Sequence, residues 1–123
     1  MRIGTDIVEC SRIQEAIDRH PESFPSMVFT AEEIGNAPGN SSARTAYFAG
    51  RWAAKEAIAK ALGCGFGEKC AWLEINIVNL PGGEPVAKLS GQALKTFGEL
   101  GAKALRISIS HERNYATAVA LIE

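Results

Sequence analysis

The chain has 123 residues, of which 46% are hydrophobic, and 13 basic against 14 acidic residues give it a formal net charge of -1. That length suits one compact domain, and the composition is typical of a folded protein rather than a disordered one. The nearly balanced charge argues against nucleic acid as the main partner, because duplex binding normally uses a broad basic face.

Three cysteines, Cys10, Cys64 and Cys70, are present, and none of them forms a C-x-x-C pair. An odd number leaves at least one thiol unpaired, which favours reduced thiols in a cytoplasmic protein. The first residues lack the basic lead and long apolar stretch of a signal peptide, and no apolar run approaches the roughly 20 residues that a membrane span requires. We therefore expect a soluble, cytoplasmic protein with no membrane partner.

The first third of the chain predicts one strand and two helices. Residues 3–8 alternate as a short strand does. Ser11-Arg12-Ile13-Gln14 matches a capping box that opens a helix, and Pro21 stops that helix. A second capping box, Thr30-Ala31-Glu32-Glu33, opens a brief helix. The residues that follow, 36–42, are rich in Gly, Asn, Ser and Pro and predict a mobile loop.

Residues 43–62 form the strongest helical segment, because they are rich in alanine and contain Gly50 as their only helix-breaking residue. Gly63 follows where a helix C-cap is expected. Residues 73–78 and 86–89 predict two short strands around a turn over residues 81–85. Helical spacing of apolar residues predicts another helix over residues 94–100, ended by Gly101.

The C-terminal residues predict a hairpin, with strands over residues 105–110 and 115–122 and a turn at Glu112-Arg113-Asn114. No internal repeat or linker divides the chain, so we expect a single domain over residues 1–123. The order of the elements predicts an α+β fold in which a small antiparallel sheet packs against the long central helix.

Four charged residues lie within residues 51–60 of that long helix. At ~100° per residue, Arg51 and Lys55 fall on its most apolar stripe, where both stems would pack and both heads could still reach water. Glu56 and Lys60 follow at i, i+4 spacing, which on an exposed helix is an ordinary ion pair. Because the rest of the helix is alanine or aromatic almost all round, the four charges together favour an anionic ligand bound with a metal ion.

Two residues outside the helix are further candidates. Asp6 lies within an apolar strand, where an unpaired carboxylate is costly, so a salt bridge or a helix cap would by itself explain it. As a magnesium ligand it would need a second carboxylate, for which Glu56 is the candidate, and phosphate oxygens. His111 ends a predicted strand, where a lone histidine is more often packed than bound to a ligand, although its serine and arginine neighbours could assemble a phosphate contact.

Together these motifs resemble the holo-[acyl-carrier-protein] synthase family, the small bacterial 4′-phosphopantetheinyl transferases. Gly4-Thr5-Asp6-Ile7-Val8-Glu9 with Arg12-Ile13 resembles the family's opening, and residues 48–57 (FAGRWAAKEA) with Lys60-Ala61-Leu62-Gly63 resemble its central helix signature. Gly83-Glu84-Pro85 and Ser108-Ile109-Ser110-His111 resemble its C-terminal part. The similarity is collinear along essentially the whole chain, and the central element is highly specific.

The resemblance implies the 4′-phosphopantetheinyl transferase fold and a homotrimer with active sites between subunits. It implies that Asp6 and Glu56 bind Mg²⁺, and that Glu56 acts, directly or through water, as base for the serine hydroxyl of an acyl carrier protein. Lys60 resembles the lysine that neutralises or protonates the leaving adenosine 3′,5′-bisphosphate. The implied reaction moves phosphopantetheine from coenzyme A to the apo-carrier protein for fatty acid biosynthesis.

The resemblance also assigns binding residues. Arg51, Lys55, Lys60 and His111 are expected near the coenzyme A phosphates. Gly83 and Pro85 are expected beside the adenine, and Arg12 and Arg19 are expected to dock the carrier protein. Many relatives carry Thr or Asp where Glu112 stands, and the role of Glu112 is open.

A competing function is a non-catalytic module that binds coenzyme A or a nucleotide. The presence of Asp6, Glu56 and Lys60 favours the enzyme, because a degenerate binding module has no need of both carboxylates. A third interpretation is a structural subunit of a larger synthase.

Overall fold

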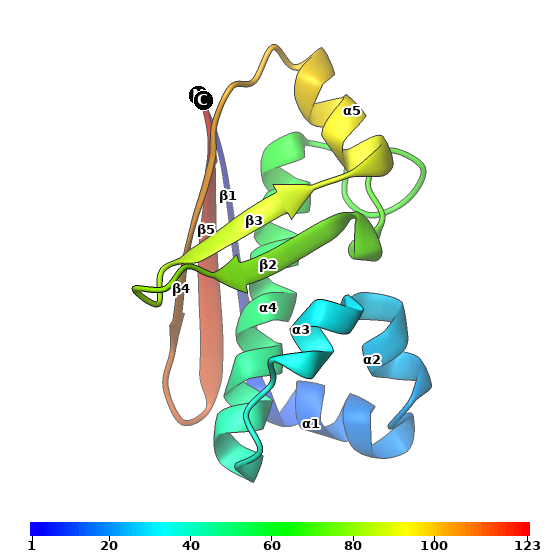
Figure 1. Cartoon of the computed structure of the whole chain (residues 1–123), viewed down its shortest axis with the longest axis vertical. Coiled ribbons are helices and arrows are strands. Elements are labelled where there is room, and N and C mark those ends of the chain that lie inside the picture. Colours follow the sequence, from blue (N-terminus) through cyan, green and yellow to red (C-terminus); the bar gives the residue numbers. More distant parts are fainter.

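The computed structural model describes all 123 residues, and antiparallel pairing joins the two ends of the chain in one three-stranded sheet. β1 (Arg2–Glu9) pairs with β5 (Tyr115–Ile122), which also pairs with β4 (Leu105–His111). The predicted hairpin of β4 and β5 is therefore confirmed. Because Arg2 pairs with Ile122, both ends of the chain lie side by side at one edge of the molecule (Figure 1).

A long helix, α4 (Ser41–Leu62), lies against one face of this sheet and forms the centre of the molecule (Figure 1). It begins two residues earlier than predicted, because the Asn40 side chain accepts a hydrogen bond from the backbone N–H of Ala43 and caps the helix. Gly63 ends it in the left-handed conformation, with φ of 82°, as predicted.

The contact between β1 and α4 is unusually close at Gly4. A methyl group at this position would lie 2.0 Å from the carbonyl oxygen of Ala57, well inside van der Waals contact. Only a residue without a side chain therefore lets the strand lie directly on the helix. This close approach positions the rest of β1 over the middle of α4.

A second, two-stranded sheet of β2 (Ile75–Asn79) and β3 (Pro85–Leu89) crosses α4 in the view of Figure 1. β2 begins two residues later than predicted, because the 3₁₀ turn η1 (Trp72–Glu74) occupies the start of the expected strand. The Glu74 carboxylate in this turn accepts N–H groups from residues 71, 92 and 93, and so caps α5 (Gly91–Glu99). These hydrogen bonds lower the pKa of Glu74.

Three helices, α1 (Cys10–Arg19), α2 (Ser23–Val28) and α3 (Ala31–Gly35), gather near the N-terminal half of α4 (Figure 1). The capping box predicted at Ser11 is wrong, because α1 follows β1 directly and starts at Cys10, two residues earlier than a cap at Ser11 would place it, without a side-chain cap. The predicted stop before Pro21 is confirmed.

The helix α2 was not predicted from the sequence, because Pro25 and short, mixed composition give no helical pattern. The capping box that opens α3 is confirmed: the Thr30 hydroxyl accepts the N–H of Glu33, and the Glu33 carboxylate accepts the N–H of Thr30. The expected loop is shorter than residues 36–42, since α4 already begins at Ser41.

The face of the three-stranded sheet that points away from α4 is not covered. Its apolar side chains include Ile3, Ile7, Tyr115 and Val119, which are 69%, 66%, 45% and 40% exposed. Their neighbours along each strand point to α4 instead, since side chains alternate between the two faces of a sheet. The α+β class with small antiparallel sheets is confirmed, and one apolar sheet face is left open to solvent.

No helix of the chain combines the length and the hydropathy needed to cross a membrane.

Candidate active site

Asp6, Glu56 and Lys60 meet where β1 lies on α4. The Lys60 ammonium donates hydrogen bonds to the Asp6 carboxylate and to the Thr5 carbonyl, both at 3.0 Å. Asp6 points toward α4 because it lies two residues after Gly4 on the same face of the strand. The Lys60 side chain remains 52% exposed, so its ammonium is still accessible to a ligand.

Asp6 and Glu56 line one cavity of about 350 Å³. Arg12 contributes a third charge to this cavity, and the rest of its wall is apolar, formed by Ile7, Val8, Ile13, Ala16, Phe24 and Trp52. Burial and the negative charge of Asp6 raise the pKa of Glu56, and the positive charge of Lys60 partly opposes this rise. Two carboxylates thus share a partly apolar cavity with one cation at its edge.

This donor set fits Mg²⁺, a hard cation that takes oxygen ligands in an octahedral shell. A bound cation would relieve the repulsion between Asp6 and Glu56 that raises the Glu56 pKa. The chain has no cluster of three or more acidic, histidine or cysteine side chains at this or any other place. The remaining ligand positions would therefore have to come from substrate oxygens and water.

Arg51 lies on another side of α4 and points to the end of β2. Its Nη2 donates to the Asn79 side chain at 3.1 Å, and its guanidinium stacks on the Tyr47 ring at 4.1 Å. Asn79 pairs with Pro85, so Arg51 reaches the start of the turn that carries Gly83. The Arg51 Nε is buried without a hydrogen-bond partner. Arg51 is therefore close to the turn and retains an unused N–H.

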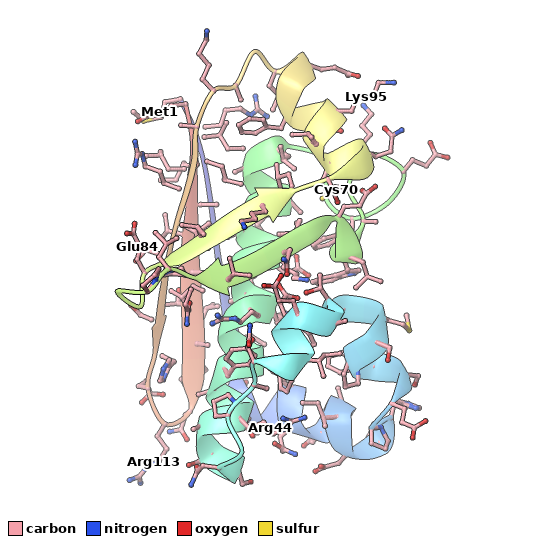
Figure 2. All side chains as sticks on the ribbon, in the orientation of Figure 1. Met1, Arg44, Cys70, Glu84, Lys95 and Arg113 are labelled. Atoms are coloured by element: carbon pink, nitrogen blue, oxygen red, sulfur yellow. The ribbon has the colours of Figure 1, made fainter.

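His111 is exposed at the end of β4 and lines a different cavity, of about 850 Å³, together with Arg113 and residues of α1 and α4. Glu112 closes the adjoining turn, since its carboxylate accepts the N–H groups of Asn114 and Tyr115 at 2.6 and 2.8 Å. Figure 2 shows Arg113 at the tip of this turn and Glu84 at the tip of the separate β2–β3 turn. The residues expected near coenzyme A thus lie at separate places on one chain.

The prediction for Lys55 does not hold in this structure. Its ammonium is 0% exposed and donates to the Glu33 carboxylate at 2.8 Å, to the Val28 carbonyl at 2.7 Å and to the Trp72 carbonyl at 3.1 Å. An ammonium has three N–H donors, so none remains for a phosphate. The alternative of a charged head reaching water is also wrong for Lys55, because burial is complete.

Arg12 and Arg19 are both exposed on α1, as a docking surface requires. Arg12 also lines the carboxylate cavity, whereas Arg19 lies in the last turn of the helix. The two arginines therefore extend from the cavity along α1.

Sequence reasoning missed three residues of this region. Phe24 and Trp52 both line the cavity. Phe24 belongs to α2, which was not predicted, and Trp52 was noted only as part of the central helix motif, without a role in the site. Glu33 was recognised as a helix cap, which it is, but nothing in the sequence indicates that its carboxylate also pairs with a lysine 22 positions later. The motif around Trp52 was the one sequence signal that could have indicated any of these three residues.

Comparisons with known proteins agree with this geometry. A sequence model described as the 4′-phosphopantetheinyl transferase superfamily matches residues 2–120. The holo-[acyl-carrier-protein] synthase of Ruminiclostridium cellulolyticum is 40% identical over 122 residues, which are 99% of this chain and 91% of that protein. The holo-[acyl-carrier-protein] synthase of a Sulfurovum species is 43% identical over 123 residues, 100% of this chain and 97% of that protein.

Solved structures give the same result. The Helicobacter pylori holo-[acyl-carrier-protein] synthase in complex with coenzyme A superposes with a TM-score of 0.87 at 30% identity, covering 98% of this chain and 99% of that one. The Neisseria meningitidis holo-[acyl-carrier-protein] synthase superposes with a TM-score of 0.90 at 31% identity, covering 99% and 97%. The chain therefore belongs to the 4′-phosphopantetheinyl transferase superfamily and, within it, to the holo-[acyl-carrier-protein] synthases.

Proposed function

We propose that this chain transfers the 4′-phosphopantetheine group of coenzyme A to a serine of an apo-acyl carrier protein, for fatty acid biosynthesis. The products are the holo-carrier protein and adenosine 3′,5′-bisphosphate. The observation that carries the proposal is the cavity shared by Asp6 and Glu56, with Lys60 bound to Asp6, in a chain whose relatives are holo-[acyl-carrier-protein] synthases. One structural neighbour was solved with coenzyme A bound.

In this proposal, Asp6 and Glu56 hold Mg²⁺ through their carboxylate oxygens, and the ion when bound neutralises charge on the coenzyme A pyrophosphate. The serine hydroxyl of the carrier protein attacks the phosphorus that bears pantetheine, and the pyrophosphate bond breaks. Glu56 accepts the hydroxyl proton directly or through water. Lys60, half exposed and bound to Asp6, neutralises the leaving bisphosphate.

Coenzyme A binding is assigned to residues at two further places. Arg51 lies beside the turn with Gly83 and Pro85, which would receive the adenine, and His111 would contact a phosphate. These residues lie apart from Asp6 and Glu56 on a single chain, and a second copy can bring them together. We therefore include a homotrimer in the proposal. The open apolar face of the β1-β5-β4 sheet supports self-association, and the number three follows from the family resemblance.

The carrier protein is proposed to dock along α1. Arg12 and Arg19 are exposed there and would attract an acidic partner, and Arg12 lies at the cavity where the serine must arrive. A cytoplasmic reaction is part of this proposal, and three unpaired cysteines support it.

The test is an intact-mass assay of several apo-acyl carrier proteins with coenzyme A, with and without Mg²⁺. We expect the carrier to gain the mass of phosphopantetheine only when both are present. No gain on any carrier, combined with measurable coenzyme A binding, would favour the non-catalytic module instead. The native mass of the protein, measured in parallel, tests the trimer.

A further inference from the structure

The ion pair of Lys55 and Glu33 is fully buried, and every polar atom in it has a partner. Beside its contact with Lys55, the Glu33 carboxylate accepts the N–H of Thr30 at 2.8 Å and the N–H of Ile77 at 2.7 Å. Both side chains are 0% exposed. Burial lowers the pKa of Lys55, and the Glu33 charge opposes that shift.

This pair joins segments that are far apart in the sequence. Lys55 of α4 binds the carbonyl of Val28, which ends α2, and the carbonyl of Trp72, which begins η1. Glu33 of α3 also binds the N–H of Ile77 in β2. Helices α2 and α3 have only six and five residues, too few to be stable without such tertiary contacts. The ion pair is thus an anchor of α2, α3 and η1 on α4.

The anchored segments carry the aromatic rings that flank Trp52. Phe24 of α2 stacks on Trp52 at 6.0 Å between ring centres, and Trp72 of η1 stacks on the same residue at 4.5 Å. Phe24 and Trp52 form the aromatic wall of the cavity that contains Glu56. Lys55 therefore holds, through two backbone carbonyls, the two segments whose rings stack on Trp52.

We propose that Lys55 and Glu33 act as positioning residues, which fix the aromatic wall of Phe24 and Trp52 against which the carrier protein places its serine. Trp72 stacks on Trp52 and supports that wall from outside the cavity. They do not contact coenzyme A. The structural part of this inference is independent of the activity, whereas the part that concerns the carrier protein rests on the proposed function.

The test compares Lys55→Met with Lys95→Met, a matched change of a lysine that projects into solvent from α5 (Figure 2). Both proteins are studied at a temperature at which far-UV circular dichroism shows them fully folded. For Lys55→Met we expect the KM for the carrier protein to rise about tenfold, and the Kd for coenzyme A with Mg²⁺ to stay within about twofold. We also expect the near-UV circular dichroism of the stacked tryptophans to weaken. Lys95→Met should match the wild type in all three measurements.

A weaker affinity for coenzyme A with unchanged tryptophan signals would overturn the proposal, because it would make Lys55 a ligand contact. Wild-type behaviour of Lys55→Met would overturn it as well. If the carrier assay shows no transfer even with the wild type, the proposed function fails, and the tryptophan signals alone still decide the structural part.

Two further measurements keep the proposal testable if Lys55→Met folds poorly. In the wild type, the ammonium protons of Lys55 should exchange slowly in ¹⁵N NMR spectra and keep their chemical shifts when coenzyme A and Mg²⁺ are added; a shift would contradict the proposal. Glu33→Gln should change the carrier KM and the tryptophan signals in the same direction as Lys55→Met. The double variant should be no worse than Lys55→Met alone, because both changes disable one unit; additive losses would contradict it.

Discussion

Lys55 and Glu56 are consecutive residues of α4, yet their charged groups lie in opposite environments. Lys55 points into a closed cluster, in which each of its N–H groups has a protein acceptor and no atom reaches water. Glu56 points into an open cluster, where it shares a cavity with Asp6 and its carboxylate has no protein hydrogen-bond partner. In the closed cluster every charged group has its partners within the protein. In the open cluster two carboxylates lie in one cavity, where a bound cation would neutralise their charge.

The difference teaches that charge on an apolar helix does not by itself indicate a ligand. Removing a charge from water is costly in both clusters. In the closed cluster that cost is offset within the protein, and the residues serve the fold. In the open cluster the cost of removing the Glu56 charge from water is not offset within the protein, and the pKa of Glu56 is raised as a result. Unsatisfied charge, rather than charge alone, marks the site.

The largest expected effect comes from breaking the closed cluster. Lys55→Met removes one partner and leaves the Glu33 carboxylate buried, which should cost about 3–5 kcal/mol of unfolding free energy. Urea denaturation of this variant beside Lys95→Met measures the loss. A destabilisation equal to that of the exposed control would mean that the buried pair does not stabilise the fold.

Breaking the open cluster should affect activity instead of the fold. Glu56→Gln keeps the shape of the side chain but removes its charge and its basicity, and the transfer rate should fall by about 100-fold or more. Glu99→Gln, on the exposed side of α5, is the matched control. Rates come from the mass gain of the carrier protein over time, and a Glu56→Gln protein as fast as the control would refute the assigned role.

The open cluster also depends on how closely β1 lies on α4. Gly4→Ala places a methyl group 2.0 Å from the Ala57 carbonyl oxygen, so the strand must move away from the helix and carry Asp6 with it. Overpacking of this kind costs about 1–3 kcal/mol, and transfer should be lost together with the Asp6–Lys60 contact. Gly39→Ala, at a position with no atoms nearby, should leave stability and rate unchanged. Melting temperatures and rates of the two variants provide the comparison.

The smallest effects concern the titration of Glu56, followed by ¹³C NMR of its carboxyl group. Asp6→Asn removes a negative neighbour and should lower the Glu56 pKa, whereas Lys60→Met removes a positive one and should raise it. Shifts in the same direction would show that Asp6 and Lys60 do not act on Glu56 through their charges.

The raised pKa also determines how Glu56 affects stability. The folded protein binds this proton more tightly than the unfolded chain, so the contribution of Glu56 is most favourable below its ordinary pKa of 4.5 and is lost as pH rises through the higher folded value. Glu56→Gln should therefore melt at a higher temperature than the wild type at neutral pH, with the difference vanishing in acid. Equal melting temperatures at neutral pH would contradict this.

The sequence was sufficient to predict most elements of the fold, because Gly63, the Thr30 capping box and the apolar alternation of the C-terminal hairpin are local signals. Helix α2 was missed because tertiary contacts stabilise it, among them the hydrogen bond from Lys55 to the Val28 carbonyl. Local patterns cannot report such contacts.

The sequence also predicted part of the candidate site. Asp6, Glu56 and Lys60 belong to specific motifs, and the structure brings them together as expected. Lys55 belongs to the same motif and was assigned a phosphate, because helical spacing gives the direction of a side chain but not the acceptors that it meets. Its partner Glu33 comes from another helix, and only the folded chain shows that the two are paired.

The pairing of Arg2 with Ile122 has a practical consequence for engineering this chain. Because the two ends of the chain lie next to each other on the adjacent strands β1 and β5, a short flexible linker can join them. New ends can then be opened between Pro38 and Gly39, an exposed position where Asn40 still caps α4. Such a circular permutant would keep every strand pairing. Strands β1 and β5 would then lie within the chain, and β5 would be synthesised before β1 without a change to the site.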